Sequence, residues 1–175
     1  MIVGAGDSNT LIGGTAEGAG NVISGNGWNG VAFSSQTSNS VVEGNFIGTD
    51  ASGTVALGNG LDGVRLFDGA RMNRIGGDTA AAGNVIAFNG GNGVTVTATN
   101  TFGNTIRANS IHSNGGIGID LGNDGATLND DGDADGGPNL LQNYPTSTEA
   151  TENTLETYVT GSFDGAANVS LTIDF

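Results

Sequence analysis

Short apolar stretches recur along residues 10–121, and turn-forming residues such as glycine and asparagine separate each from the next. One stretch, an asparagine followed by two mostly apolar residues, occurs at 21–23, 45–47, 84–86 and 109–111. A second, a glycine followed by alternating residues, comes after each of these at 30–33, 63–66, 93–96 and 116–119. A repeat of this size cannot bury its own apolar face, so it must stack on its neighbours. The pattern therefore predicts a solenoid.

A third apolar stretch precedes the other two in every repeat, at 10–12, 40–42, 74–75 and 105–106. Three short strands per repeat indicate an all-β fold, a single-stranded parallel β-helix of about four coils. Successive strand residues point to opposite faces, which assigns inward positions to Val31 and Phe33, Val64 and Leu66, Val94 and Val96, and Ile117 and Ile119. The same alternation predicts an outward column of Ala32, Arg65, Thr95 and Gly118.

Asparagine recurs at the turns between these stretches. A carboxamide both donates to and accepts from its copy in the next coil, so we expect two stacked ladders: Asn21, Asn45, Asn84 and Asn109, and Asn26, Asn59, Asn89 and Asn114. We interpret them as architecture and not as a ligand site. The glycines Gly30, Gly63 and Gly93 are expected to supply the positive φ of tight turns.

The chain carries a formal charge of -14 and contains no lysine and no cysteine. Such a charge repels nucleic acid and anionic lipid and favours solubility and cations. We find no apolar run long enough to cross a membrane and no signal segment near Met1. The chain is therefore either cytosolic or a mature or excised piece of a longer secreted protein.

Several strings resemble the bacterial secreted and surface proteins with right-handed parallel β-helix repeats in the pectate-lyase-like superfamily. They are residues 21–26, 47–50, 56–59, 118–122 and, more loosely, 129–145. The resemblance implies a right-handed helix, an extracellular or cell-surface location, and a segment followed by further β-structure. It implies no substrate, and such segments usually have no assigned activity.

Ionisable groups crowd only in the acidic segment 120–135. Its residues Asp131, Asp133 and Asp135 alternate and are followed by a glycine, as at the start of a calcium loop. Position twelve is Gln142 in place of a bidentate glutamate, so calcium binding would be weak or would need a further ligand such as Asp130. The alternative is a solvated acidic linker.

An enzyme of this superfamily would need carboxylates and a basic residue on stacked outward positions. The expected outward column pairs no two carboxylates, so we predict a non-catalytic extracellular structural module: a scaffold, an adhesin segment or a self-assembling filament subunit. The alternative is a carbohydrate-binding or polysaccharide-cleaving β-helix, in which Trp28 would stack on a sugar. The lone His112 is expected to be an ordinary surface residue.

The ends of the helix are the remaining candidate surface. We expect the β-helix to span 1–121, an acidic loop 122–146, and a C-terminal hairpin 147–175 with strands at 155–163 and 169–175. An isolated hairpin is marginally stable, so we predict head-to-tail association of copies. The residues expected to contribute are Ile2, Val3, Val159, Phe163, Leu171, Ile173 and Phe175. A fragment boundary inside a longer protein would predict a monomer instead.

Overall fold

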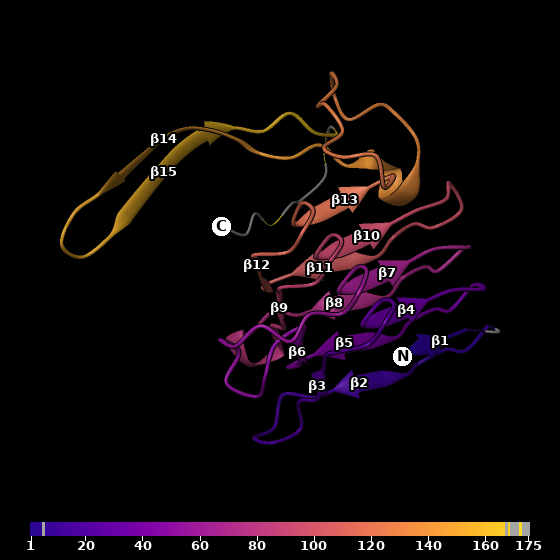
Figure 1. Cartoon of the computed structure of the whole chain (residues 1–175). Coiled ribbons are helices and arrows are strands. Elements are labelled where there is room, and N and C mark those ends of the chain that lie inside the picture. The colour runs from indigo at the N-terminus through magenta and orange to yellow at the C-terminus, as the bar shows by residue number, and fades with distance from the viewer. Residues whose placement is uncertain (5, 167, 169–171, 173–175) are drawn as a thin grey trace.

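The computed structural model describes residues 1–4, 6–166, 168 and 172. Three parallel sheets run along a single stack of coils (Figure 1). Sheet 1 contains β1 (Ile2–Val3), β4 (Val31–Phe33), β7 (Val64–Leu66), β10 (Val94–Val96) and β13 (Ile119–Leu121). Sheet 2 contains β2 (Leu11–Gly13), β5 (Val41–Glu43), β8 (Arg74–Gly76) and β11 (Thr105–Arg107). Sheet 3 contains β3 (Val22–Ile23), β6 (Phe46–Ile47), β9 (Val85–Ala87) and β12 (Ser110–His112).

Every neighbouring pair within these three sheets is parallel and joins one coil to the next. The prediction of a parallel β-helix is therefore confirmed. The structure also contains a strand that the sequence pattern did not reveal. This strand, β1, pairs with β4 and begins sheet 1 before the first complete coil.

The core lies inside the coils and is formed by the inward side chains of all three sheets. In sheet 1 the expected inward pairs of β4, β7 and β10 are fully buried. They pack with Ile12, Val42 and Ile75 from sheet 2 and Ile47 and Ile86 from sheet 3. Burying such side chains is the main favourable contribution to folding, at roughly 1.5–3 kcal/mol each.

The last coil has a different register from the expected one. Ile119 pairs with Val94 and Leu121 pairs with Val96, so the fourth repeat is displaced by two residues along the chain. Ile117, which we expected to point inward, precedes β13 and is 38% exposed. Ile119 does take an inward position, in register with Val94, but is 43% exposed in this last coil. Leu121 takes the second inward position and packs against the core, and Asp120 replaces Gly118 in the outward column.

Both expected asparagine ladders are present. In each, the backbone N–H and the Nδ2 of one asparagine donate to the Oδ1 of the asparagine in the next coil. Asn45 donates to Asn84 over 3.0 and 2.9 Å, and Asn59 donates to Asn89 over 3.2 and 2.8 Å. Most of these nitrogens also donate to carbonyl oxygens of the coil before, as Asn84 does to Val42.

A third ladder, not recognised in the sequence, lies at the corner before sheet 2. Its members are Thr10, Ser40, Asn73, Asn104 and Asn139, joined by hydrogen bonds that run from each to the next. The first two members are not asparagines, which conceals the column in a comparison of repeats. Its last member comes from the loop after the coils.

Gly30, Gly63 and Gly93 have a different role from the predicted one. None of them has a positive φ. A Cβ on Gly63 would lie 2.4 Å from Ile86 and 2.7 Å from the carbonyl oxygen of Gly93. Glycine is required here because the next coil approaches closely, and not because the backbone turns to the left.

Residues 122–145 fold over the end of the stack next to β13 (Figure 1), and we call this segment the cap. It contains the short helix η2 (Pro138–Leu141). A second short helix, η1 (Ala80–Ala82), lies in the insertion between β8 and β9.

The C-terminal hairpin pairs differently from the expected hairpin. Its strands are β14 (Thr146–Glu152) and β15 (Thr157–Ser162), which are antiparallel. β15 matches the expected strand at 155–163, but its partner precedes it in the chain. Most of the expected second strand at 169–175 lies outside the described residues. The hairpin projects away from the coils (Figure 1), and every residue of both strands is exposed.

Candidate functional site

The outward face of sheet 1 brings charged and uncharged side chains into one column. The strand register places Ile2, Ala32, Arg65, Thr95 and Asp120 in one column. Arg65 and Asp120 therefore share this outward column, whereas the expected column ended in Gly118 and contained no carboxylate. The sequence did contain a signal for the position of Asp120, because Ile119-Asp120-Leu121 alternates in the same way as Val64-Arg65-Leu66.

Asp120 is committed to holding backbone. Asp120 is only 3% exposed. Oδ1 accepts from the N–H groups of Asn123 and Asp124 over 2.8 and 3.3 Å. Oδ2 accepts from Nδ2 of Asn92 over 3.0 Å and from the N–H of Gly125 over 3.2 Å. With hydrogen bonds to both of its oxygens, this carboxylate fixes the start of the cap.

Asp62, the other carboxylate of this region, is similarly engaged. It is buried, and its Oδ1 accepts from the N–H of Asn92 over 3.0 Å. Its Oδ2 lies 3.7 Å from the Arg65 guanidinium, which also lies 5.7 Å from the centre of the Phe67 ring. The polar groups of this column thus stabilise turns and the neighbouring coils.

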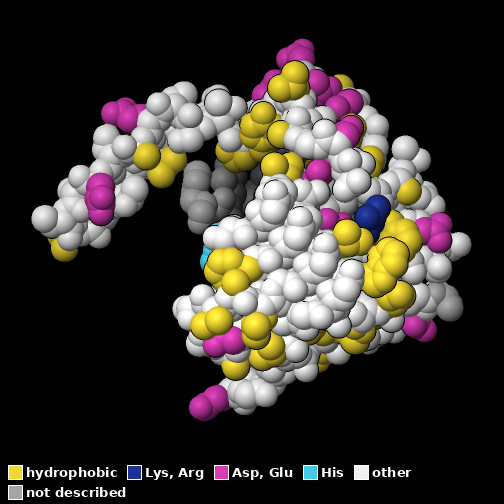
Figure 2. All heavy atoms as spheres, in the orientation of Figure 1, with side chains coloured by type: hydrophobic (Ala, Val, Ile, Leu, Met, Phe, Trp, Pro, Cys, Tyr) yellow, Lys and Arg dark blue, Asp and Glu magenta, His cyan; other side chains and the backbone are white. Residues whose placement is uncertain are grey.

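The acidic loop brings three of the four expected metal ligands together. Carboxylate oxygens of Asp130, Asp133 and Asp135 lie within 4.8 Å of one another. Asp131 is exposed and is not part of this group. Acidic side chains gather at the cap end of the molecule, as Figure 2 shows.

The cluster is held by the loop's own backbone. Asp130 accepts from the N–H of Ala134 over 3.1 Å, and Asp133 accepts from the N–H of Asn143 over 2.8 Å. Within the described residues, Oδ1 of Asp135 has no hydrogen-bond partner. Burial, together with the charges of Asp130 and Asp133, raises the pKa of Asp135 above its usual value. The three carboxylates therefore repel one another unless a cation or proton joins them.

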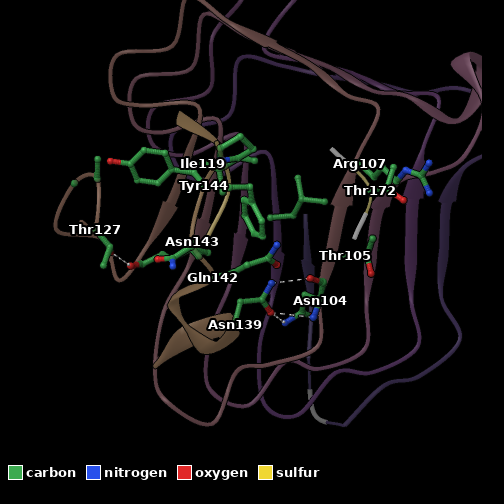
Figure 3. Close-up of a pocket in the computed structure, with 16 residues that line it drawn as sticks. Asn104, Thr105, Arg107, Ile119, Thr127, Asn139, Gln142, Asn143, Tyr144 and Thr172 are labelled. Atoms are coloured by element: carbon green, nitrogen blue, oxygen red, sulfur yellow. Dashed lines mark hydrogen bonds between the residues drawn. The ribbon is translucent and has the colours of Figure 1, made fainter. Parts of the chain in front are cut away.

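A cleft of about 720 Å³ lies between the last coil and the cap (Figure 3). β11 forms one wall, and Gln142, Asn143 and Tyr144 of the cap line the other side. The lining combines carboxamide and hydroxyl groups with apolar carbon, and it also includes Phe163.

Trp28, which would stack on a sugar in the alternative function, and His112, which we expected to be an ordinary surface residue, both lie on the surface. Trp28 is 76% exposed in the turn before β4. His112 pairs with Ala87 in register, as the repeat predicts, and its Nδ1 lies 3.2 Å from Oγ of Ser113. Its ring contacts Phe88 edge-on at 5.9 Å.

The residues expected to mediate assembly have different environments. Ile2 is 79% exposed, whereas Val3 is 7% exposed and belongs to the core. Val159 lies on the exposed strand β15, and Phe163 lines the cleft beside the last coil. Leu171, Ile173 and Phe175 lie outside the described residues.

The fold places the chain among parallel β-helix proteins of solenoid architecture. No family model, no curated protein and no solved structure matches it. In the part of the chain that the structure describes, no helix is long and apolar enough to span a membrane.

Proposed function

We propose that this chain is a non-catalytic, extracellular structural module that acts as a scaffold or spacer. One observation carries the proposal: the polar side chains that enzymes of this architecture would present on a sheet are here engaged in internal hydrogen bonds. Asp120 and Asp62 are the clearest cases, because both are buried and both bind backbone N–H groups. Resemblance of the repeat strings to secreted β-helix proteins supports the location.

The alternative function, carbohydrate binding, is favoured by the cleft beside the cap. Tyr144 is partly exposed there and offers an aromatic surface, and Gln142 and Thr105 offer hydrogen-bonding groups. Aromatic stacking with a few convergent polar groups is a common way to bind small ligands.

One experiment separates these two functions. The chain is applied to a glycan array and incubated with neutral and acidic polysaccharides, while new reducing ends and unsaturated products are followed. A structural module gives no array signal and no product. Array binding that is lost in Tyr144→Ala but kept in Trp28→Ala, which changes an aromatic residue outside the cleft, would establish the alternative.

We further propose that the acidic loop takes up calcium as a weak structural ion. Three convergent carboxylates provide the hard oxygen ligands that calcium prefers. Because the ion would bind the folded loop and not the unfolded chain, it would stabilise the fold.

Calcium should raise the melting temperature of the unaltered chain and of Asp131→Asn, but should have little effect on Asp135→Asn. Without calcium, Asp135→Asn should itself melt slightly higher at low ionic strength, because it removes a repelling charge. That gain should disappear near 1 M salt, where the screening length falls to about 3 Å. Differential scanning calorimetry measures both effects. Equal calcium responses in Asp131→Asn and Asp135→Asn would refute the site.

A further inference from the structure

The asparagine ladders have a direction, and this direction makes the two ends of the stack chemically different. In each ladder, the backbone N–H and one Nδ2 hydrogen point towards the C-terminal coil, and the Oδ1 acceptor points towards the N-terminal coil. Asn21 donates its N–H and Nδ2 to Oδ1 of Asn45, over 3.1 and 3.0 Å. Asn26 does the same to Asn59, over 3.2 and 2.7 Å.

The N-terminal end therefore presents acceptors. We define the N-terminal face as the end formed by β1, β2 and β3 with their corner residues Asn21 and Asn26. Both asparagines are exposed, and within the described residues no donor reaches the Oδ1 of either. The exposed apolar side chains of Ile2, Leu11 and Val22 lie on the same three strands. Exposed strand edges with apolar side chains are typical association surfaces.

The opposite end presents donors at the matching corners. Oδ1 of Asn109 accepts from Asn84, and Oδ1 of Asn114 accepts from Asn89. Their backbone N–H groups, which would donate to a further coil, have no acceptor in the described part of the chain. A second copy placed by the same step that relates one coil to the next would join these donors to the acceptors of its N-terminal face.

At the third ladder, however, the cap already occupies the position of a further coil. Oδ1 of Asn139 accepts from the N–H and the Nδ2 of Asn104, over 2.9 and 3.3 Å, the same pair of bonds that links successive coils. Asn139 also donates its N–H to the carbonyl oxygen of Thr101 over 2.7 Å. Figure 3 shows the two carboxamides facing each other.

We propose that the N-terminal face binds the C-terminal coil of a second copy of this chain, and that the cap blocks this contact while Asn139 is bonded to Asn104. The proposal rests on the structural function proposed above and specifies its partner. Hydrogen-bond complementarity and continuity with the coil-to-coil interface both favour a second copy as the occupant. Release of the cap would let copies add head to tail, and such a contact does not close on itself.

The test is to loosen the cap by a single substitution in the full chain. Asn139→Ala removes the carboxamide that replaces the next coil. Asn39→Ala is the matched control, because Asn39 has nearly the same backbone angle (φ of 53° against 51°) and is exposed. Amide hydrogen exchange at residue 139, whose backbone N–H donates to the carbonyl oxygen of Thr101, reports whether the cap has opened, and sedimentation velocity reports the mass.

The unaltered chain and Asn39→Ala should remain monomers, with the backbone N–H of residue 139 protected. Asn139→Ala should lose protection at this N–H and form oligomers whose mean mass rises with concentration. Adding Leu11→Lys and Val22→Lys to Asn139→Ala should restore the monomer, because both positions are exposed on the N-terminal face and charged edges prevent strand pairing.

Three results would overturn the proposal. They are an Asn139→Ala chain that loses protection at residue 139 and stays monomeric, one that keeps this N–H protected, and oligomers that persist after the two lysines are added. The sugar-binding and cleavage assays use the unaltered chain, because Asn104 and Asn139 also line the cleft. Failure of the proposed contact is therefore distinguishable from failure of the structural function.

Discussion

Replacing Phe33 with alanine should destabilise the chain by about 3–5 kcal/mol, the range found when a fully buried aromatic side chain is truncated. Phe33 is fully buried on β4 and lies in register between Val3 and Leu66. Coils on both sides fix its surroundings, so the space cannot collapse without breaking the strand pairing. Urea unfolding followed by circular dichroism measures the change.

Phe102→Ala is the matched control for Phe33→Ala, because the same atoms are removed from a side chain that is 40% exposed. We expect a loss of about 1 kcal/mol or less, as for most substitutions near the surface. Comparable losses in both variants would mean that Phe33 is not part of a continuous packed column, and would contradict the stacked core.

The core of the first three coils could be predicted from the sequence because β-strand alternation and the repeat reinforce each other there. Val31, Val64 and Val94 follow equivalent glycines and occupy equivalent positions. In the fourth coil Gly116-Ile117 imitates this signature two residues early. The true pair, Gly118-Ile119, leads to Leu121, whose side chain reaches the core.

The cap and the candidate sites were less predictable, because they depend on contacts between segments that share no repeat. Of the alternating aspartates Asp131, Asp133 and Asp135, the structure brings Asp133 and Asp135 together and joins them with Asp130, which the sequence offered only as a further ligand. Nothing local indicates that Asn139 completes the ladder that begins at Thr10 and Ser40. Its left-handed conformation, shared with Leu140 and Leu141, arises from how η2 docks on Thr101 and Asn104.

Replacing Asn45 with aspartate should destabilise the fold by at least about 3 kcal/mol at pH 7, because it leaves several buried acceptors without a donor. Asn45 is 1% exposed. Its Nδ2 donates to Oδ1 of Asn84 and to the carbonyl oxygens of Ile12 and Glu43, over 2.9 to 3.0 Å. A carboxylate would place a charged oxygen against these three oxygens.

Asn21→Asp is the control within the same ladder. Asn21 is exposed, and its Nδ2 makes one side-chain bond, to Asn45. An aspartate there can turn its charge to water, and its backbone N–H still donates to Asn45. We expect a loss of about 1 kcal/mol, the usual value of a single hydrogen bond.

The Asn45→Asp penalty should also depend on pH, with a definite sign. Burial among oxygens raises the folded-state pKa of the new carboxyl above the unfolded value of about 3.9. Between these two pKa values the folded chain binds more protons than the unfolded chain, so stability relative to the unaltered protein falls as pH rises through this window. Protonation restores one donor towards Asn84, and the penalty should therefore shrink as pH falls towards about 4. Urea midpoints of the variant and the unaltered chain, compared at each pH, measure the difference. The ladder explanation requires that the charge of the carboxylate destabilises the buried position. A penalty that stays constant from pH 7 to pH 4 would contradict it.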